Sequence, residues 1–415
     1  METFKTMGYF ADYYYLKNAF NQDEDVIQLY NNSLSICNLP FESRNCHILP
    51  GEDSYDDSGI VFPKTPDYQN AISPEINEIL NLADSKVFEN RFFKYSVFMP
   101  GRASKADEAI LLFHGLNEKN WFKYLPWAKS LVELTGKAVI LFPIAFHMNR
   151  APADWSDFRT MNDLKYVRQG LFPAIVGSSF ANVAISTRLH ILPQRFFWSG
   201  VQTFYDVLQL LSEIKSGHHP LISTHATIDF FAYSVGAFLT EILLMDDSSG
   251  YLNQSRLFMF CGGPVFNRMS PVRKSIIDSE ANIALYSFFL EHLDNYLKKD
   301  KRLAHYFSSQ HSEGMVFKAM LDYNKMIEFR EEKLRNISSR IKALALKKDL
   351  VVPHYEVLNT LKGAERDIPV EVQVLDFPYQ YSHENPFPVS DKIIEQVEKC
   401  YLEVFSTAAR FLTNK

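Results

Sequence analysis

The sequence has few cysteines and lacks the long apolar runs of membrane proteins. No run of about 18 apolar residues is present, so we expect no transmembrane helix. Residues 1–20 have no cationic start followed by an apolar core and a small-residue cleavage site, so no secretory signal is predicted. We therefore expect a cytoplasmic protein with reduced thiols, although the first two cysteines would be able to bridge in an oxidising compartment. The four cysteines, none in a C-x-x-C pair, are Cys37, Cys46, Cys261 and Cys400.

Basic blocks, internal repeats and low-complexity segments are also missing. The formal net charge is -6, and no cluster of lysines and arginines indicates a nucleic-acid or anionic-lipid partner. Apolar residues are abundant instead, at 47%, with 34 Phe and 21 Tyr, most of which we expect in the core. This composition excludes global disorder. A length of 415 residues fits anything from one large decorated domain to about three ordinary domains.

Apolar runs alternate with amphipathic segments along most of the chain. Such alternation predicts an α/β fold with a mostly parallel sheet and helices on both faces, because strands buried on both sides read as continuous apolar runs. The predicted strands are 92–99, 109–113, 138–142, 228–233, 256–261, 341–346 and 370–377. The predicted helices are 125–134 (closed by Gly136), 201–214, 238–245 and 390–412.

The predicted strands delimit the domain organisation. Residues 1–88 are expected to form an N-terminal extension packed on the core, with an acidic, turn-rich stretch at 53–57 and helical spacing over 73–83. Residues 89–415 form the main domain, interrupted by insertions at about 147–197 and 270–338. Both insertions leave from strand C-terminal ends, where ligands bind in parallel sheets, so we expect them to cap the site. The alternative is a pair of solvated helical decorations.

A serine lies at the turn between a predicted strand and a predicted helix. The apolar run 228–233 ends at Ser234, with Ala232 two positions before it and Gly236 two positions after it. Small residues there let strand and helix approach closely, which holds the serine in a strained conformation with its hydroxyl exposed. The pattern is typical of a catalytic serine, and the alternative is an ordinary serine in a tight turn. Ala232 departs from G-x-S-x-G by one methyl group.

An acid and a histidine follow the serine, each just past a later predicted strand. Asp349 follows the strand at 341–346, and His383 is the only histidine after the last strand. Histidine suits removal of the serine proton because its unperturbed pKa is about 6.5, and a carboxylate orients its ring. Asp376 and Glu384 are nearby acids, but neither lies where this topology delivers the acid.

The order serine, acid, histidine resembles the α/β-hydrolase superfamily. The resemblance covers residues 90 to 410 approximately, and includes Phe113–Leu116, which is similar to the oxyanion-loop motif of that superfamily. The stretches 123–127 and 142–150 are similar to an uncharacterised bacterial branch of it. The resemblance implies an α/β-hydrolase-like fold with helical cap insertions and an oxyanion hole formed by the backbone amides of Leu116 and Val235.

Four side chains are candidates for lining the substrate pocket: His114, Tyr233, His147 and Arg150. For His114 the favoured alternative is a structural role, shaping the loop that presents the Leu116 amide. Arg150 is a candidate for binding an anionic group of the substrate, and the alternative is an ion pair with Asp154.

Together these residues predict a serine hydrolase that cleaves carboxylic ester bonds, or thioester or amide bonds, through an acyl-enzyme on Ser234. A small-molecule ester is the expected substrate. No cofactor or metal is expected, because the His218–His219 pair has no carboxylate or cysteine at ligand spacing. Two alternatives remain: an acyltransferase on the same triad, and a non-catalytic binding protein of the same fold, which would typically have lost the serine or the histidine.

Overall fold

The structure is a computed structural model that describes residues 8–49, 51, 54–57, 59–62, 83–101 and 104–413. The strands, in chain order, are β1 (Val26–Leu29), β2 (Leu34–Glu42), β3 (Tyr55–Asp57), β4 (Ile60–Phe62), β5 (Phe92–Pro100), β6 (Ala106–Phe113), β7 (Ala138–Leu141), β8 (Ile222–Tyr233), β9 (Leu257–Phe260), β10 (Ile341–Leu346) and β11 (Glu371–Leu375). The helices are α1 (Tyr9–Ala19), α3 (Phe88–Arg91), α4 (Tyr124–Thr135), α5 (Phe158–Leu171), α6 (Val183–Ile191), α7 (Arg195–Lys215), α8 (Val235–Asp246), α9 (Ser279–Tyr286), α10 (Leu293–Lys299), α11 (Lys301–Tyr306), α12 (Ser312–Ala319), α13 (Ile327–Ile337), α14 (His354–Leu361) and α15 (Ile394–Thr413). A π-helical segment, Ser287–His292, joins α9 to α10.

The central sheet has the strand order β1-β2-β5-β7-β6-β8-β9-β10-β11. From β7 to β11 every neighbouring pair is parallel, whereas β5, β2 and β1 are each antiparallel to the strand beside them. The chain therefore steps from β6 to one side, forms β7, and returns to the other side to form β8. Loops that follow β6 and β8 diverge at this reversal of strand order, which is where open α/β sheets bind ligands.

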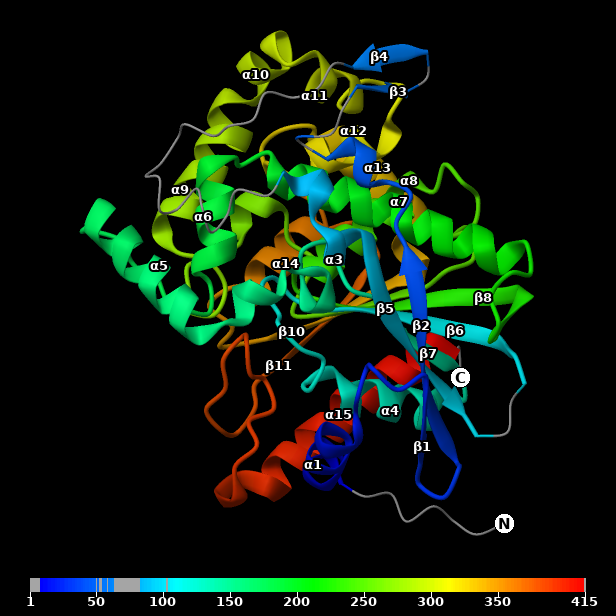
Figure 1. Cartoon of the computed structure of the whole chain (residues 1–415). Coiled ribbons are helices and arrows are strands. Elements are labelled where there is room, and N and C mark those ends of the chain that lie inside the picture. The colour runs from blue at the N-terminus through cyan, green and yellow to red at the C-terminus, as the bar shows by residue number, and fades with distance from the viewer. Residues whose placement is uncertain are drawn as a thin grey trace.

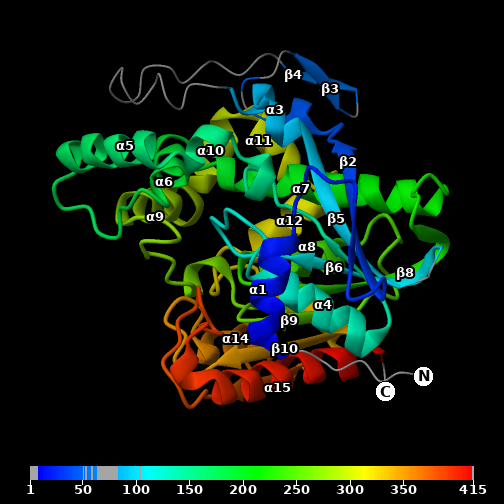
Figure 2. The ribbon, with the colours of Figure 1, turned by 60° about the horizontal axis from the view of Figure 1, so that its bottom comes forward.

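Helices cover both faces of the sheet, as the sequence predicts. One face packs against α1, α4 and α15, and the opposite face packs against α7, α8 and the insertions. Figures 1 and 2 both show α1, α4 and α15 together on the side away from the insertion helices. The residues of β7 and β9 are all buried, which explains why these strands read as uninterrupted apolar runs. The architecture is α/β-hydrolase-like.

The two insertions pack against each other. The first contributes α5 and α6, and the second contributes α9 to α13 (Figure 1). Arg168 of α5 pairs with Asp278, which caps α9, at 2.7 Å between Nε and Oδ2, and both side chains are fully buried. The side-chain amide of Asn182 donates to the backbone oxygen of Arg273 at 2.9 Å. A buried ion pair and backbone contacts of this kind indicate an ordered unit rather than two separate decorations.

The N-terminal region is more integrated than the expected extension. Its strands β1 and β2 extend the central sheet through an antiparallel ladder between β2 and β5. Helix α1 lies against α4 and α15, where Lys129 pairs with Asp12 at 2.8 Å and the rings of Tyr9 and Tyr401 stack at 4.4 Å. Residues 55–57 of the acidic stretch form strand β3 of the β3–β4 hairpin. The predicted helix at 73–83 lies outside the described residues apart from its last position.

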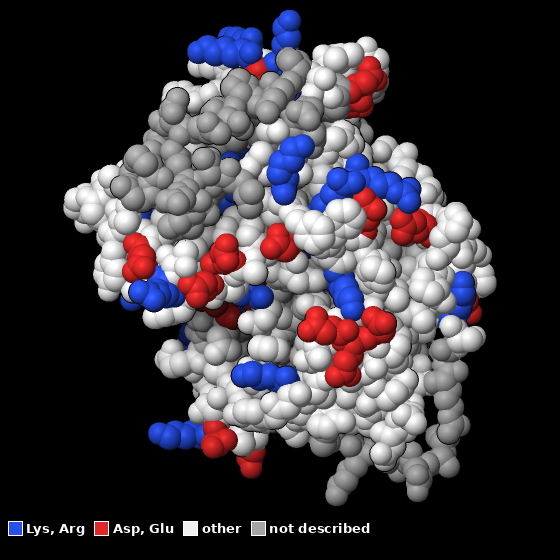
Figure 3. Space-filling view, viewed as in Figure 1, with Lys and Arg blue, Asp and Glu red and all other residues white. Residues whose placement is uncertain are grey.

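The remaining expectations from composition concern thiols, membrane spans and charge. All four cysteines are buried and free. Within the described ranges, no helix has the combination of length and apolar character required for a bilayer crossing. On the face shown in Figure 3, acidic and basic side chains lie singly or in small groups of one or both signs among uncharged residues.

Candidate active site

Ser234 lies at a strained turn between β8 and α8. Its backbone has φ 56° and ψ −122°, outside the regions that residues other than glycine usually adopt. Close packing around the turn explains the glycine that follows. A Cβ atom on Gly236 would lie 2.7 Å from Cβ of Phe113 and 2.8 Å from the backbone oxygen of His114. The turn thus requires glycine, which has no side chain, two residues after the serine, as the sequence pattern predicts.

Ser234, His383 and Asp349 form one hydrogen-bonded chain. The Nε2 atom of His383 lies 2.8 Å from Oγ of Ser234, and its Nδ1 atom lies 2.7 Å from Oδ2 of Asp349. All three are buried, with exposures of 8%, 4% and 3% for serine, histidine and aspartate. In the neutral ring, Nδ1–H donates to the carboxylate and Nε2 accepts the serine hydroxyl hydrogen. This is the arrangement in which an imidazole can take a proton from serine.

Asp349 is oriented by the turn that follows β10. Its Oδ1 atom accepts hydrogen bonds from the amides of Val351 and Val352 at 2.8 and 2.9 Å, which leaves Oδ2 for His383. These two hydrogen bonds fix the orientation of the carboxylate.

The two other acids considered from the sequence lie elsewhere. Asp376 pairs with Lys348 at 3.0 Å, where both side chains are exposed. Glu384 accepts a hydrogen bond from the hydroxyl of Ser275 at 2.8 Å. Neither contacts the nitrogen atoms of His383.

Tyr233 holds His383 in place. Its ring stacks on the imidazole, with centroids 5.2 Å apart and planes inclined by 19°, and its hydroxyl donates to the backbone oxygen of His383. Tyr233 also lines the cavity in front of Ser234. The sequence identified Tyr233 as a pocket residue, but its positioning role follows from contacts across 150 residues of chain, which no local pattern reveals.

The loop after β6 packs against the turn at Ser234 and brings a backbone amide there, in addition to the amide of Val235. A Cβ atom on Gly115 would lie 3.5 Å from Cβ of Ser234, so this loop lies directly against the turn. In the described chain, the next amide, that of Leu116, has no backbone acceptor. The amide of Val235 is the first of helix α8 and has no acceptor within the helix. Both amides are thus available near Ser234, and the positive end of the helix dipole points to the same place.

His114 makes hydrogen bonds that fix the shape of this loop. Its Nδ1 atom lies 2.8 Å from the backbone oxygen of Gly115, and its Nε2 atom accepts a hydrogen bond from the amide of Ile144 at 3.0 Å. Burial and the neighbouring His147 keep the pKa of His114 well below its ordinary value, so the ring is neutral. The structural alternative for His114 therefore describes its contacts better than a pocket role.

His147 does line the cavities beside Leu116. Its Nδ1 atom lies 2.9 Å from the backbone oxygen of Ala145, which makes Nδ1 the protonated nitrogen. The Nε2 atom is buried and has no hydrogen-bond partner among the described residues. Burial lowers the pKa of His147 to about 4, so Nε2 is an unprotonated acceptor at neutral pH.

The position of Arg150 corrects the expectation from the sequence. Its side chain is fully buried and pairs with Asp206 at 2.7 Å rather than with Asp154. It also donates to the backbone oxygens of Pro143 and Asn90. These contacts use the guanidinium to join α7 to the loop after β7, so it is not available to bind a substrate anion.

Two cavities of different character meet at Leu116. A polar cavity of about 290 Å³ contains Ser234 and His383. An apolar cavity of about 60 Å³ extends behind Leu116 and Val235. Its remaining lining is mostly aromatic and aliphatic and includes Phe196, Phe197, Phe204, Phe238, Leu239, Ile242 and Phe317.

Both insertions contribute residues to the polar cavity and contact the loop after β6. Ala181 and Ser275, one from each insertion, line the cavity together with Ser234. The side-chain amide of Asn117 donates to the backbone oxygens of Ala181 and Ser275, at 3.0 and 2.8 Å. Asn117, which follows Leu116 in the chain, therefore links the loop after β6 to both insertions.

Comparison with solved structures finds similarity to several esterases. A mutant of the esterase Est22 is 11% identical with a TM-score of 0.45, covering 97% of this chain and 86% of that one. Carboxyl esterase 2 from the mycorrhizal fungus Tuber melanosporum is 9% identical with a TM-score of 0.42, covering 77% and 81%. A thermostable esterase from Pseudomonas putida is 8% identical with a TM-score of 0.40, covering 98% and 91%.

A comparison with curated proteins finds no match. The family model described as "Family of unknown function (DUF6051)" matches residues 7–413, nearly the whole length, and the chain therefore belongs to this family.

Proposed function

We propose that the protein is a serine hydrolase of the α/β-hydrolase superfamily that cleaves carboxylic ester bonds. The observation that carries the proposal is the hydrogen-bonded chain from Ser234 through His383 to Asp349, with 2.8 and 2.7 Å contacts at a strained strand-to-helix turn. The free amides of Leu116 and Val235 beside this turn support the same chemistry, since acyl transfer requires donors for an oxyanion.

The proposed reaction proceeds in two halves. Oγ of Ser234 attacks the ester carbonyl carbon while Nε2 of His383 takes the hydroxyl proton, and Asp349 stabilises the resulting imidazolium. The amides of Leu116 and Val235 bind the negatively charged oxygen of the tetrahedral intermediate. Its collapse breaks the bond to the leaving alcohol, which takes the proton from His383, and leaves an acyl-enzyme. Water then attacks the acyl group by the same steps and regenerates the serine. Thioesters and amides fit the same sequence.

The different polarity of the two cavities supports binding of the acyl portion of the substrate in one and of its alcohol portion in the other. The apolar cavity is small and lies behind the amides, which suits a short acyl chain or a small ring. The polar cavity in front of Ser234 is lined by groups such as Asn117, Glu118 and Lys119, and suits a polar alcohol portion. The acceptor Nε2 of His147, buried near Leu116, favours a substrate with a hydrogen-bond donor close to the acyl group.

Labelling with a fluorophosphonate probe tests the proposal. The probe phosphonylates only a serine activated by a base, so the wild-type protein should react rapidly and Ser234→Ala should not react. Ser199→Ala is the matched control, because Ser199 lines the apolar cavity but donates its hydrogen bond to the backbone oxygen of Arg195. The control should react like wild type. Equal labelling of Ser234→Ala and wild type, or no labelling of a folded wild-type protein, would refute the proposal.

A further inference from the structure

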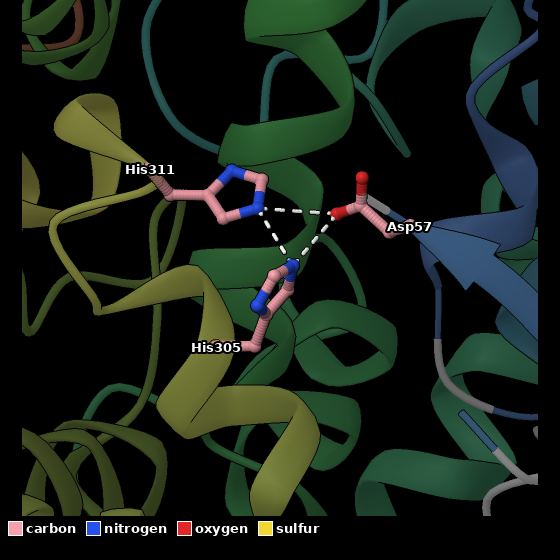
Figure 4. Close-up of side chains that lie close together, drawn as sticks. All are labelled: Asp57, His305 and His311. Atoms are coloured by element: carbon pink, nitrogen blue, oxygen red, sulfur yellow. Dashed lines mark hydrogen bonds and ion pairs between the residues drawn. The ribbon is translucent and has the colours of Figure 1, made fainter. Parts of the chain in front are cut away.

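Two histidines of the second insertion and one aspartate of the N-terminal hairpin converge on a single point. His305 is on α11, His311 precedes α12, and Asp57 ends β3. Figure 4 shows the two rings and the carboxylate pointing toward one another. The Nε2 atoms of the two histidines are 3.0 Å apart, and each lies 3.1 Å from Oδ2 of Asp57.

The three buried acceptor atoms need a hydrogen or a cation between them. His305 and His311 are 6% and 7% exposed, and the Asp57 side chain is one quarter exposed. Two imidazole nitrogens and a carboxylate oxygen in mutual contact all present lone pairs to the same small volume. Removing such groups from water is costly unless a cation or a proton occupies that volume.

The contacts of Glu313 determine which nitrogen of His311 faces this point. Oε1 of Glu313 lies 2.8 Å from Nδ1 of His311 and accepts a hydrogen bond from the hydroxyl of Tyr205 at 2.6 Å. Nδ1 therefore carries the hydrogen, and the lone pair of Nε2 is directed at Asp57 and His305. A carboxylate that orients a histidine in this way is the usual support of a metal-binding imidazole.

We propose that Asp57, His305 and His311 bind a divalent zinc ion. Tetrahedral zinc with bonds of about 2.0–2.1 Å places its ligand atoms about 3.3 Å apart. The three observed separations of 3.0 to 3.1 Å form a nearly equilateral triangle that needs only a few tenths of an ångström of expansion. Two imidazoles and one carboxylate match the ligand preference of zinc, and the fourth position is left for water.

This ion would join the β3–β4 hairpin to the cap. Glu313, which supports His311, also lines the apolar cavity behind Leu116, so the metal site and that cavity share one side chain. Asp57 lies 248 residues before His305 in the sequence, so no local spacing of ligands indicates a metal site. The zinc site does not depend on the proposed hydrolase activity.

Zinc titration of the metal-depleted full chain tests the site. Protein dialysed against a chelator should bind one equivalent of Zn²⁺ in competition with a chromophoric indicator. Asp57→Asn and His305→Gln should each weaken this binding at least tenfold, because each removes one ligand. His292→Gln is the matched control, since His292 lies in the same insertion but is exposed. His383→Gln should also keep the equivalent, which separates this site from the catalytic histidine.

Two outcomes would overturn the zinc site. One is a wild-type protein that binds no Zn²⁺, which would mean that a proton alone links the three groups. The other is unchanged affinity in Asp57→Asn and His305→Gln. Thermal melting without metal establishes that the variants are folded, and the absorption spectrum of the Co²⁺-substituted protein reports whether the ligand geometry is tetrahedral.

Discussion

Glu241 is a deeply buried acid of α8 that the proposed chemistry does not use. Its side chain is fully buried, and neither carboxyl oxygen has a hydrogen-bond partner in the described part of the chain. Burial raises the pKa of Glu241 well above its ordinary value, so the folded protein keeps a proton that the unfolded chain releases. Stability linked to this group is therefore complete below the unfolded pKa of about 4.3 and is lost as the pH rises toward the folded pKa.

The variant Glu241→Gln should remove this pH dependence. Glutamine keeps the shape of the side chain but cannot ionise. The free energy of unfolding of the variant, relative to that of wild type, should therefore increase above pH 5 by at most about 1.4 kcal/mol per pH unit, and this pH-dependent difference should vanish near pH 4. Denaturant unfolding at a series of pH values measures the difference. The exposed Glu332→Gln on α13 provides the control and should show no such trend. A constant difference between Glu241→Gln and wild type at all pH values would contradict the assignment.

Individual site residues differ in how far the sequence reveals them. Ser234, Asp349 and His383 follow strand ends, so a local pattern and a chain order sufficed to select them, and the structure places them in contact. The partner of Arg150 was missed because Asp206 lies 56 residues away on α7. Asp154 was expected as the ion-pair partner of Arg150 because it is near in the sequence, and nearness in the sequence does not give distance in space.

Helix α8 depends on a close approach to β6 at Gly236. Replacement by alanine would put a methyl carbon within 2.8 Å of main-chain and Cβ atoms of β6 and its following residue, which cannot rotate away. We expect Gly236→Ala to lower the free energy of unfolding by about 1–3 kcal/mol and to slow fluorophosphonate labelling at least tenfold, because α8 and the Val235 amide must shift. Melting and labelling rates measure both effects.

Gly170 of α5 offers the matched control for this variant. Its Cβ position has no neighbour within 4 Å, so Gly170→Ala should be neutral or stabilising by about 0.5–1 kcal/mol, with unchanged labelling. If Gly236→Ala behaved like Gly170→Ala, the close packing at the turn would not be a requirement.

Among the elements, buried strands of the parallel sheet were the most predictable. The predicted strand at 341–346 matches β10, and the helix predicted at 125–134 matches α4, including Gly136 in the left-handed conformation with φ 74°. Helix α7 begins at Arg195, six residues before its predicted start, because its first turns bury the adjacent residues Phe197 and Trp198 instead of following the helical spacing seen from Val201 onward. Strand β2 was missed because its partner β5 lies fifty or more residues further along the chain, and β1 was missed because it joins the sheet only through β2.

At the scale of the whole molecule, the cap is held together by the Arg168–Asp278 pair. Asp278→Asn would leave a buried guanidinium without its counter-charge, at a cost of about 3–5 kcal/mol. Because the cap is a separate layer from the sheet, we expect this cost to appear as local opening. Hydrogen exchange should accelerate in α5, α6 and α9, while β6 and β8 stay protected.

A surface ion pair serves as the control for this variant. Arg335 and Asp367 pair at 2.8 Å with both side chains largely exposed, so Asp367→Asn should change exchange little. Unaltered exchange in the cap of Asp278→Asn would show that the two insertions do not depend on this contact.

The hydrogen bonds of Asn117 have a consequence for timing. They reach both insertions from the residue beside the Leu116 amide, so neither insertion can swing outward without loosening the backbone that would receive the developing negative charge. Entry of a substrate and its conversion would then occur at different times. The proposed oxyanion hole would therefore be incomplete in any conformation in which an insertion has moved away from Asn117.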